Sequence, residues 1–309
     1  NLGDQNNSNS TGGTGTRGIA AGGRESAPAF SDIIEYITIS TLGNAQDFGN
    51  LGRGTGRSGA VASRTRGVFI GGQSPSPVYS DHVDYITFAS TGDVTDFGTN
   101  LTTGGIGAKG CSNGTRGVFV IGTSAPAGAG VNSINYLEIA STGSSIPDFG
   151  DLSESRWQVF STGNSVRGLW GGGTDGTRKD TIDYVTISTL GNAQDFGNLT
   201  QIRALGEAVS NSTRAIFAGG SNSPNNYNII DFITIASTGN AQDFGDLTEA
   251  RKDNSGMSSP TRGVFATGNP KTATMDYITI PTTGNAIDFG DATSRDEACQ
   301  GMSNGHGGL

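Results

Sequence analysis

The chain has 309 residues, of which 51 are glycine and only 33% are hydrophobic. This balance suits short strands joined by tight turns and excludes a fold of long amphipathic helices. The formal net charge of −9 would repel a phosphate backbone, and no apolar run approaches the roughly eighteen residues that cross a bilayer. The sequence therefore predicts no nucleic-acid partner and no membrane insertion.

Two short motifs recur along the chain, Thr-Arg-Gly or a close variant, and Asp-Phe-Gly. Successive motif arginines are 47 to 51 residues apart, which indicates one supersecondary unit copied six times. We predict a single domain with repeats at about residues 2–50, 51–100, 101–151, 152–198, 199–246 and 247–292, followed by a closing strand at 293–309. The motif residues are Arg17, Arg66, Arg116, Arg167, Arg214 and Arg262; Asp47, Asp96, Asp148, Asp195, Asp243 and Asp288; and Phe48, Phe97, Phe149, Phe196, Phe244 and Phe289.

Each repeat contains four predicted strands. The first follows Thr-Arg-Gly as an apolar run that ends in glycine, as at residues 67–72. The second, as at residues 84–90, alternates polar and apolar side chains with a period of two. A tight turn such as Ser-Thr-Gly-Asn-Ala leads into the third strand, which carries Asp-Phe-Gly. The fourth, as at residues 249–259, holds small side chains that suit the crowded centre of a propeller.

The tail of the chain repeats the start of the pattern. Its last seven residues, Ser-Asn-Gly-His-Gly-Gly-Leu, match residues 112–118 in register, so one copy of the innermost strand is redundant. Residues 3–15 are almost free of apolar side chains, whereas residues 298–302 have some. We therefore expect residues 298–302 to pair with residues 18–23. The prediction is an all-β, six-bladed propeller with four short antiparallel strands per blade, closed by the C-terminal strand.

The recurring motifs favour an architectural role over a catalytic one. Asp-Phe-Gly also occurs in kinases, but this chain has neither their glycine-rich phosphate loop with a strand lysine nor a His-Arg-Asp motif. In the architectural interpretation the phenylalanines wedge between blades. Because a buried carboxylate needs a donor, we expect each motif aspartate to be buried and to accept a hydrogen bond from a motif arginine or a backbone amide.

The inventory of reactive side chains predicts a protein that is not an enzyme. His82 and His306 occupy non-equivalent positions, so neither a histidine-rich metal centre nor a hydrolytic triad is indicated, and no cofactor is expected. Cys111 and Cys299 belong to different repeats and are predicted to be buried free thiols. A glycan-cleaving carboxylate pair stays open as an alternative, with five loop carboxylates as candidates. These are Glu25, Asp81, Glu154, Glu207 and Glu249.

One face of the propeller should carry the individual features of each repeat. The turns Ser-Thr-Gly-Asn-Ala and Ser-Asn-Gly-Thr-Arg-Gly scarcely change, whereas the loop after the glycine pair differs in every copy. Variable loops on a rigid scaffold are where recognition usually lies, although unconstrained drift would give the same pattern. Aromatic rings, amides and cations suit a sugar or a protein partner. The candidates are Arg24, Phe30, Tyr79, His82, Arg156, Trp157, Arg178, Lys179, Asn225, Tyr227 and Lys271.

The repeat resembles the Kelch family, whose blades carry a glycine pair after an apolar strand and two later aromatic residues. The matching positions are Gly71, Gly72, Tyr85 and Phe97 in the second repeat, and Gly219, Gly220, Phe232, Phe244 and Arg251 in the fifth. The later aromatic is phenylalanine where Kelch repeats have tryptophan, and the glycine pair is broken at Ile121 and Thr267.

The repeat also has a longer consensus, IDYITIASTGNAQDFGDLTxAR followed by SNGTRGVFAGG. This longer repeat phrase is similar to repeat proteins of tailed phages that infect aquatic bacteria. This resemblance implies a virion or extracellular protein, such as a tail fibre, appendage or capsid-surface module. Its partners would be other virion proteins and a host-surface glycan or protein, and a homo-oligomer stays open. The alternative is a secreted or cell-surface bacterial lectin-like propeller.

Overall fold

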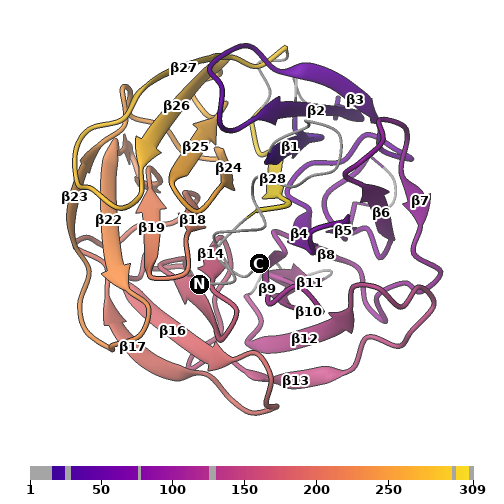
Figure 1. The fold of residues 1–309 in the computed structure, drawn as a ribbon. Coiled ribbons are helices and arrows are strands. Elements are labelled where there is room, and N and C mark those ends of the chain that lie inside the picture. Colours follow the sequence, from indigo (N-terminus) through magenta and orange to yellow (C-terminus); the bar gives the residue numbers. More distant parts are fainter. Residues whose placement is uncertain (1–15, 25–28, 76–77, 125–129, 294–296, 306–309) are drawn as a thin grey trace.

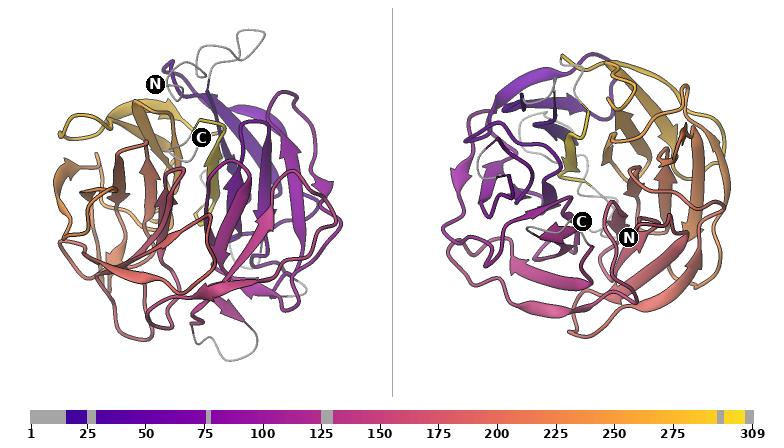
Figure 2. Two further views of the ribbon diagram at one scale, coloured as in Figure 1. Left: turned by 60° about the horizontal axis from the view of Figure 1, so that its bottom comes forward. Right: turned by 180° about the vertical axis from the view of Figure 1, so that it is seen from behind.

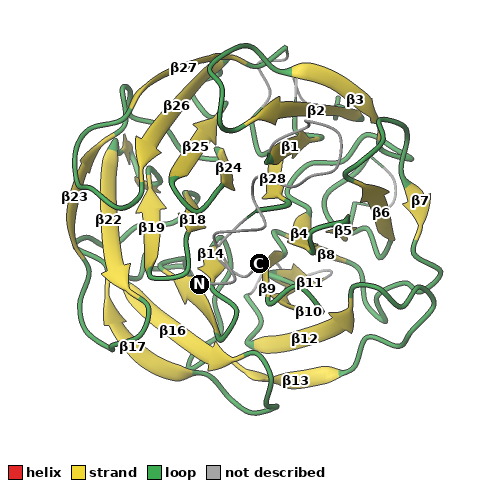
Figure 3. Ribbon diagram, viewed as in Figure 1, coloured by secondary structure: helices red, strands yellow, loops and turns green. Residues whose placement is uncertain are grey.

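The computed structural model describes residues 16–24, 29–75, 78–124, 130–293 and 297–305. These residues form six sheets of four antiparallel strands, arranged as blades around a central axis (Figure 1). The described residues contain no helix (Figure 3). The views from other directions show the same ring of blades (Figure 2). The predicted six-bladed, all-β propeller is confirmed.

In five blades the innermost strand is the one that precedes the arginine motif, and in the remaining blade it is the C-terminal strand; the strand that contains the motif aspartate is outermost in all six. From the centre outward, the blades are β28 (Gln300–Ser303), β1 (Arg17–Ala21), β2 (Ile33–Thr38) and β3 (Gln46–Asn50); β4 (Gly59–Ala62), β5 (Arg66–Ile70), β6 (Val83–Thr87) and β7 (Thr95–Asp96); β9 (Lys109–Ser112), β10 (Arg116–Val120), β12 (Ser133–Glu138) and β13 (Asp148–Asp151); β14 (Phe160–Gly163), β15 (Arg167–Gly171), β16 (Thr181–Thr186) and β17 (Gln194–Asn198); β18 (Glu207–Ser210), β19 (Arg214–Ala218), β22 (Ile229–Thr234) and β23 (Gln242–Asp246); and β24 (Ser255–Ser258), β25 (Arg262–Ala266), β26 (Thr274–Thr279) and β27 (Ile287–Asp291). We number the blades 1 to 6 in this order. Two short ladders lie outside them, β8 (Gly105–Ile106) with β11 (Thr123–Ser124), and β20 (Ser221–Asn222) with β21 (Asn225–Asn226).

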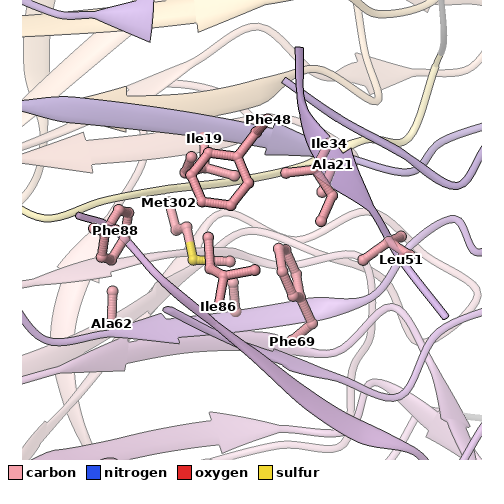
Figure 4. Close-up of a cluster of buried hydrophobic side chains, with 11 residues drawn as sticks. Ile19, Ala21, Ile34, Phe48, Leu51, Ala62, Phe69, Ile86, Phe88 and Met302 are labelled. Atoms are coloured by element: carbon pink, nitrogen blue, oxygen red, sulfur yellow. The ribbon is translucent and has the colours of Figure 1, made fainter. Parts of the chain in front are cut away.

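The C-terminal strand closes the ring. Strand β28 pairs with β1, with Met302 opposite Ile19 and Gln300 opposite Ala21, as the sequence predicted. The Met302 side chain enters the hydrophobic cluster between blades 1 and 2 (Figure 4). Closure therefore buries apolar surface as well as pairing a strand edge.

The Asp-Phe-Gly phenylalanines form the inter-blade cores, as predicted. All six are at most 3% exposed, and each meets an aromatic ring of its own blade edge to face. Phe196 of blade 4 packs in one cluster with Phe217, Ile233 and Ile235 of blade 5. Burial of each phenylalanine contributes roughly 1.5–3 kcal/mol.

The expectation for the motif aspartates is wrong. All six lie on the solvent side of the outermost strand and are exposed. Adjacent residues of a strand face opposite ways, so the inward phenylalanine sends its neighbour outward. Asp96 and Asp195 accept a local glycine amide, but none of the six carboxylates accepts a hydrogen bond from a motif arginine.

The motif arginines fasten each blade to the next. Each guanidinium lies 4.3–4.7 Å from the centroid of a Tyr or Phe ring in its own blade. Each also donates a hydrogen bond to a backbone carbonyl of the following blade. The series includes Arg262, which reaches Ile39 of blade 1. The seam is therefore fastened in the same way as the other five boundaries.

The uniform turns between the third and outermost strands are also fasteners. In all six, the turn glycine donates its N–H to the carbonyl of the motif phenylalanine of the preceding blade, at 2.7–3.1 Å. In five boundaries, the next residue, Asn or Asp, accepts a backbone N–H from that same outer strand. A Cβ on Gly197 would lie 2.4 Å from the Gly239 carbonyl oxygen, which explains the glycine of the motif.

The glycine of the arginine motif is required by packing. A Cβ on Gly117 would lie 2.5–2.9 Å from three atoms of Val61, a stiff β-branched side chain of the preceding blade. Gly117→Ala is therefore expected to lower the free energy of unfolding by about 1–3 kcal/mol. In a double-mutant cycle measured by urea denaturation, Val61→Ala should recover much of this loss. Additive losses would contradict the packing explanation. Blade 5 naturally carries Ala215 at the equivalent position.

Candidate binding face

The variable loops gather on one face of the ring, together with the segments that lead into the innermost strands. Isolated backbone bridges join the two sets, as between Gly56 and Gln73, Ala204 and Ser221, and Lys252 and Asn269. We call this side the variable face, and the side with the uniform turns the turn face. The loops of the variable face thus differ in their side chains, whereas equivalent backbone bridges hold several of them in place.

At the centre of the variable face, a ring of left-handed residues surrounds the mouth of a channel. The six equivalent positions have φ between 53° and 74°. At five of the six steps, the N–H donates to the carbonyl of the equivalent residue one blade back, at 2.6–3.0 Å. Left-handed backbone is unfavourable for most residues, so the hydrogen bonds offset strain stored around the mouth. The six residues are Arg57, Gly107, Gln158, Leu205, Asp253 and Ala298.

The mouth opens into a cavity whose lining includes both basic and acidic side chains. Arg57 and Asp253 face each other across it at 3.5 Å. Burial raises the pKa of Asp253, and the charge of Arg57 opposes that rise. Lys109 reaches across the channel to pair with Glu207 at 2.5 Å. Beyond this pair, the innermost strands surround a further space lined mostly by small side chains.

Arg178 and Lys179 extend the charged zone outward from the mouth. The guanidinium of Arg178 donates to Gln158 at 3.0 Å, and burial lowers its pKa. Lys179 pairs with Glu154 at 3.1 Å and Asp175 at 3.0 Å. Both predicted residues therefore lie on the variable face, where Arg178 contacts the rim of the cavity and Lys179 is held by acids.

Most other predicted site residues also lie on the variable face but apart from one another. Phe30, Tyr79, Trp157 and Tyr227 are half-buried, whereas Asn225 and Lys271 are exposed. They are spread over blades and do not form one pocket.

Two basic side chains among the candidates lie beside acids. Arg24 pairs with Glu297, whose pKa is lowered because hydrogen bonds from Asn269 and Arg24 outweigh the effect of burial. His82 lies 3.7 Å from Asp81. Arg24 lies in blade 1 and His82 in blade 2, each with an acidic side chain beside it.

Arg156 does not belong to the candidate surface. Its side chain is fully buried and donates to Asp183 at 2.9 Å, so its role is structural. Equivalent buried pairs join Arg203 to Asp231 and Arg251 to Asp276. Sequence reasoning missed these pairs. The available signal was the aspartate that precedes Tyr or Phe in the second predicted strand, with an arginine 25 to 28 residues upstream.

The carboxylates considered for glycan cleavage are divided among different blades. Glu154, Glu207 and Glu249 each lie next to a cation, respectively Lys179, Lys109 and Arg251. Glu25 and His306 lie outside the described residues. Of the cysteines, Cys111 is buried, and desolvation raises its pKa to about 12. Cys299 is also buried, and its thiol donates to the Gly22 carbonyl.

A scan against protein-family models and a search of curated proteins both find no match. Within the described ranges, no three His, Cys, Asp or Glu side chains are grouped so that they could hold a metal ion. The described residues also contain no helix long and apolar enough to cross a membrane.

Proposed function

We propose that the protein is a non-catalytic recognition module that binds its partner through the variable face. The observation that carries the proposal is the unequal use of the two faces. The turn face is uniform because its glycines and asparagines fasten neighbouring blades. On the variable face, equivalent backbone bridges recur in several blades, but the side chains differ from blade to blade. These side chains surround a channel mouth lined by charged residues. A propeller that displays individual loops suits binding.

The side chains of the variable face favour a glycan or a protein surface as the partner. Half-buried rings such as Tyr79, Trp157 and Tyr227 offer flat apolar area, and neighbouring amides and cations offer hydrogen bonds. The similarity of the repeat phrase to tailed-phage proteins supports a virion setting, as a tail fibre, appendage or capsid-surface module facing the host envelope. Other virion proteins would then hold the module in place.

The proposal predicts that changes confined to the variable face abolish attachment. Replacing Tyr79, Arg178 and Tyr227 together by alanine should remove binding to host-surface polysaccharide on a glycan array and to whole cells. The melting temperature should stay within about 3 °C, because these side chains lie outside the inter-blade clusters and surface changes have small effects on stability.

A matched control changes the turn face. Leu42 and Leu190 are each 59% exposed in equivalent turns, and their double alanine variant should bind normally. Normal attachment by the triple variant together with loss in the turn variant would place the working face on the opposite side. Release of reducing ends from a bound glycan would instead show a glycan-cleaving enzyme. Tail and capsid genes beside this one would distinguish the virion setting from a bacterial lectin.

A further inference from the structure

Blades 4, 5 and 6 each bury one guanidinium in the same set of acceptors. In blade 5, Arg203 donates to the Phe217 carbonyl, the Ile229 carbonyl and the Asp231 carboxylate, at 2.9–3.2 Å. Arg156 of blade 4 and Arg251 of blade 6 make the equivalent contacts, at 2.7–3.4 Å. Two backbone oxygens and one carboxylate therefore define a guanidinium site within a blade.

Blade 2 keeps the acceptors of this site but lacks the arginine. Strand pairing places Phe69 opposite Asp84, just as Phe217 lies opposite Asp231 in blade 5. The Gly71 amide donates a hydrogen bond to the His82 carbonyl, and in blade 5 the Gly219 amide donates one to the Ile229 carbonyl. Thr55 stands at the arginine position. The Thr55 carbonyl accepts a hydrogen bond from the Gly23 amide, just as the Arg251 carbonyl accepts one from the Gly220 amide. A cavity lies there, lined by Thr55, Phe69, Ser80, His82 and Asp84.

Blade 3 has lost both charged members of the site. Its arginine position is Gly105, and its aspartate position is Asn135, which lies opposite Phe119. Arginine and carboxylate are therefore missing together there. Blade 2 retains its aspartate without an arginine, unlike blades 3 to 6, and an unpaired carboxylate in a partly buried cavity is unfavourable for folding.

No described residue donates a hydrogen bond to the Asp84 carboxylate. In blades 4 to 6 the aspartate also accepts from a Ser or Thr hydroxyl, but blade 2 has Gly52 at that position. Arg53 lines the cavity without forming an ion pair with Asp84, and its buried Nε has no partner among the described residues. Burial raises the pKa of Asp84, opposed by the charges of His82 and Arg53 and reinforced by Asp96.

We propose that the blade 2 cavity binds a guanidinium group supplied by a ligand, such as an arginine side chain of a partner protein. The guanidinium would take the place that Arg203 fills in blade 5, between Asp84 and the carbonyls of Phe69 and His82. His82 and Asp81, 35% and 43% exposed, lie at the rim, so the site opens on the variable face. The cavity would accept its guanidinium whatever the rest of that face binds.

Titration of the full chain with ethylguanidinium, followed by amide NMR shifts, tests the site. Saturable shifts are expected at amides of residues 53–84 in the wild type. Thr55→Arg should abolish them, because its own guanidinium occupies the acceptors as in blade 5. Asp84→Asn should weaken binding at least about tenfold, because hydrogen bonds to charged groups contribute about 1.5–3 kcal/mol.

Two further variants sharpen the result. Arg53→Gln copies Gln201 of blade 5 and should strengthen binding several-fold by removing a like charge from the lining of the cavity. Asp195→Asn, an exposed carboxylate in blade 4, should leave the titration unchanged. Equal affinity in the wild type and Asp84→Asn, or shifts spread over all blades, would overturn the proposal even if Thr55→Arg failed to fold.

Discussion

Replacing Asp231 by asparagine is expected to lower the free energy of unfolding by about 3–5 kcal/mol. Asp231 and Arg203 are both fully buried, 2.9 Å apart, and no other carboxylate among the described residues pairs with Arg203. Removing the negative charge leaves a guanidinium in a medium of low dielectric constant, which is costly even though the amide can still accept a hydrogen bond. Urea denaturation followed by tryptophan fluorescence would measure the change.

The matched control is Asp243→Asn in the same blade. Asp243 belongs to the conspicuous Asp-Phe-Gly motif but is exposed, so its replacement should change the free energy of unfolding by no more than about 0.5 kcal/mol. If the motif aspartate proved the more costly of the two, the structural role assigned to the buried pairs would be wrong.

Phe196→Ala is expected to cost about 3–5 kcal/mol. The Phe196 ring is 2% exposed, meets Tyr184 with centroids 5.8 Å apart, and packs against blade 5. Truncation leaves a cavity at a blade boundary, where the fastening turn that bonds the Phe196 carbonyl limits relaxation. Thermal and urea unfolding should both show the loss.

Leu190→Ala serves as the control for this substitution, because Leu190 is 59% exposed in the turn of the same blade. It should be nearly neutral. A small effect of Phe196→Ala, comparable to that of Leu190→Ala, would mean that the blades are held together by their backbone fasteners and not by the phenylalanine wedges.

Repetition made the architecture predictable from the sequence. Six copies of the motifs fixed the number of blades, the run of small residues identified the innermost strand, and the duplicated text at the C-terminus identified the closing strand. The aspartates were misjudged because burial was inferred from recurrence. Since Phe48 faces inward, the alternation of a strand already placed Asp47 outside. The phenylalanine wedges, which were also predicted from the recurrence of the motif, are confirmed.

The candidate site was only partly predictable. The loops that vary were correctly placed on one face, but the channel mouth was missed because it exists only when the ring is closed. Arg57 and Asp253 are almost two hundred residues apart in the sequence, and Lys109 and Glu207 belong to blades 3 and 5. No local pattern links such positions. The blade 2 cavity likewise becomes visible only when Thr55 is compared with Arg203 in three dimensions.

The outer turns have a consequence for how these molecules behave when crowded. The outermost strand of a propeller blade presents a free edge, which in an open sheet invites pairing with a second chain. Here the turn of the next blade already occupies part of that edge, bonding the carbonyl of the motif phenylalanine and, at five boundaries, a backbone N–H two residues on. The perimeter therefore resists β-sheet aggregation, and many copies could be held side by side at high local concentration without fusing into fibres.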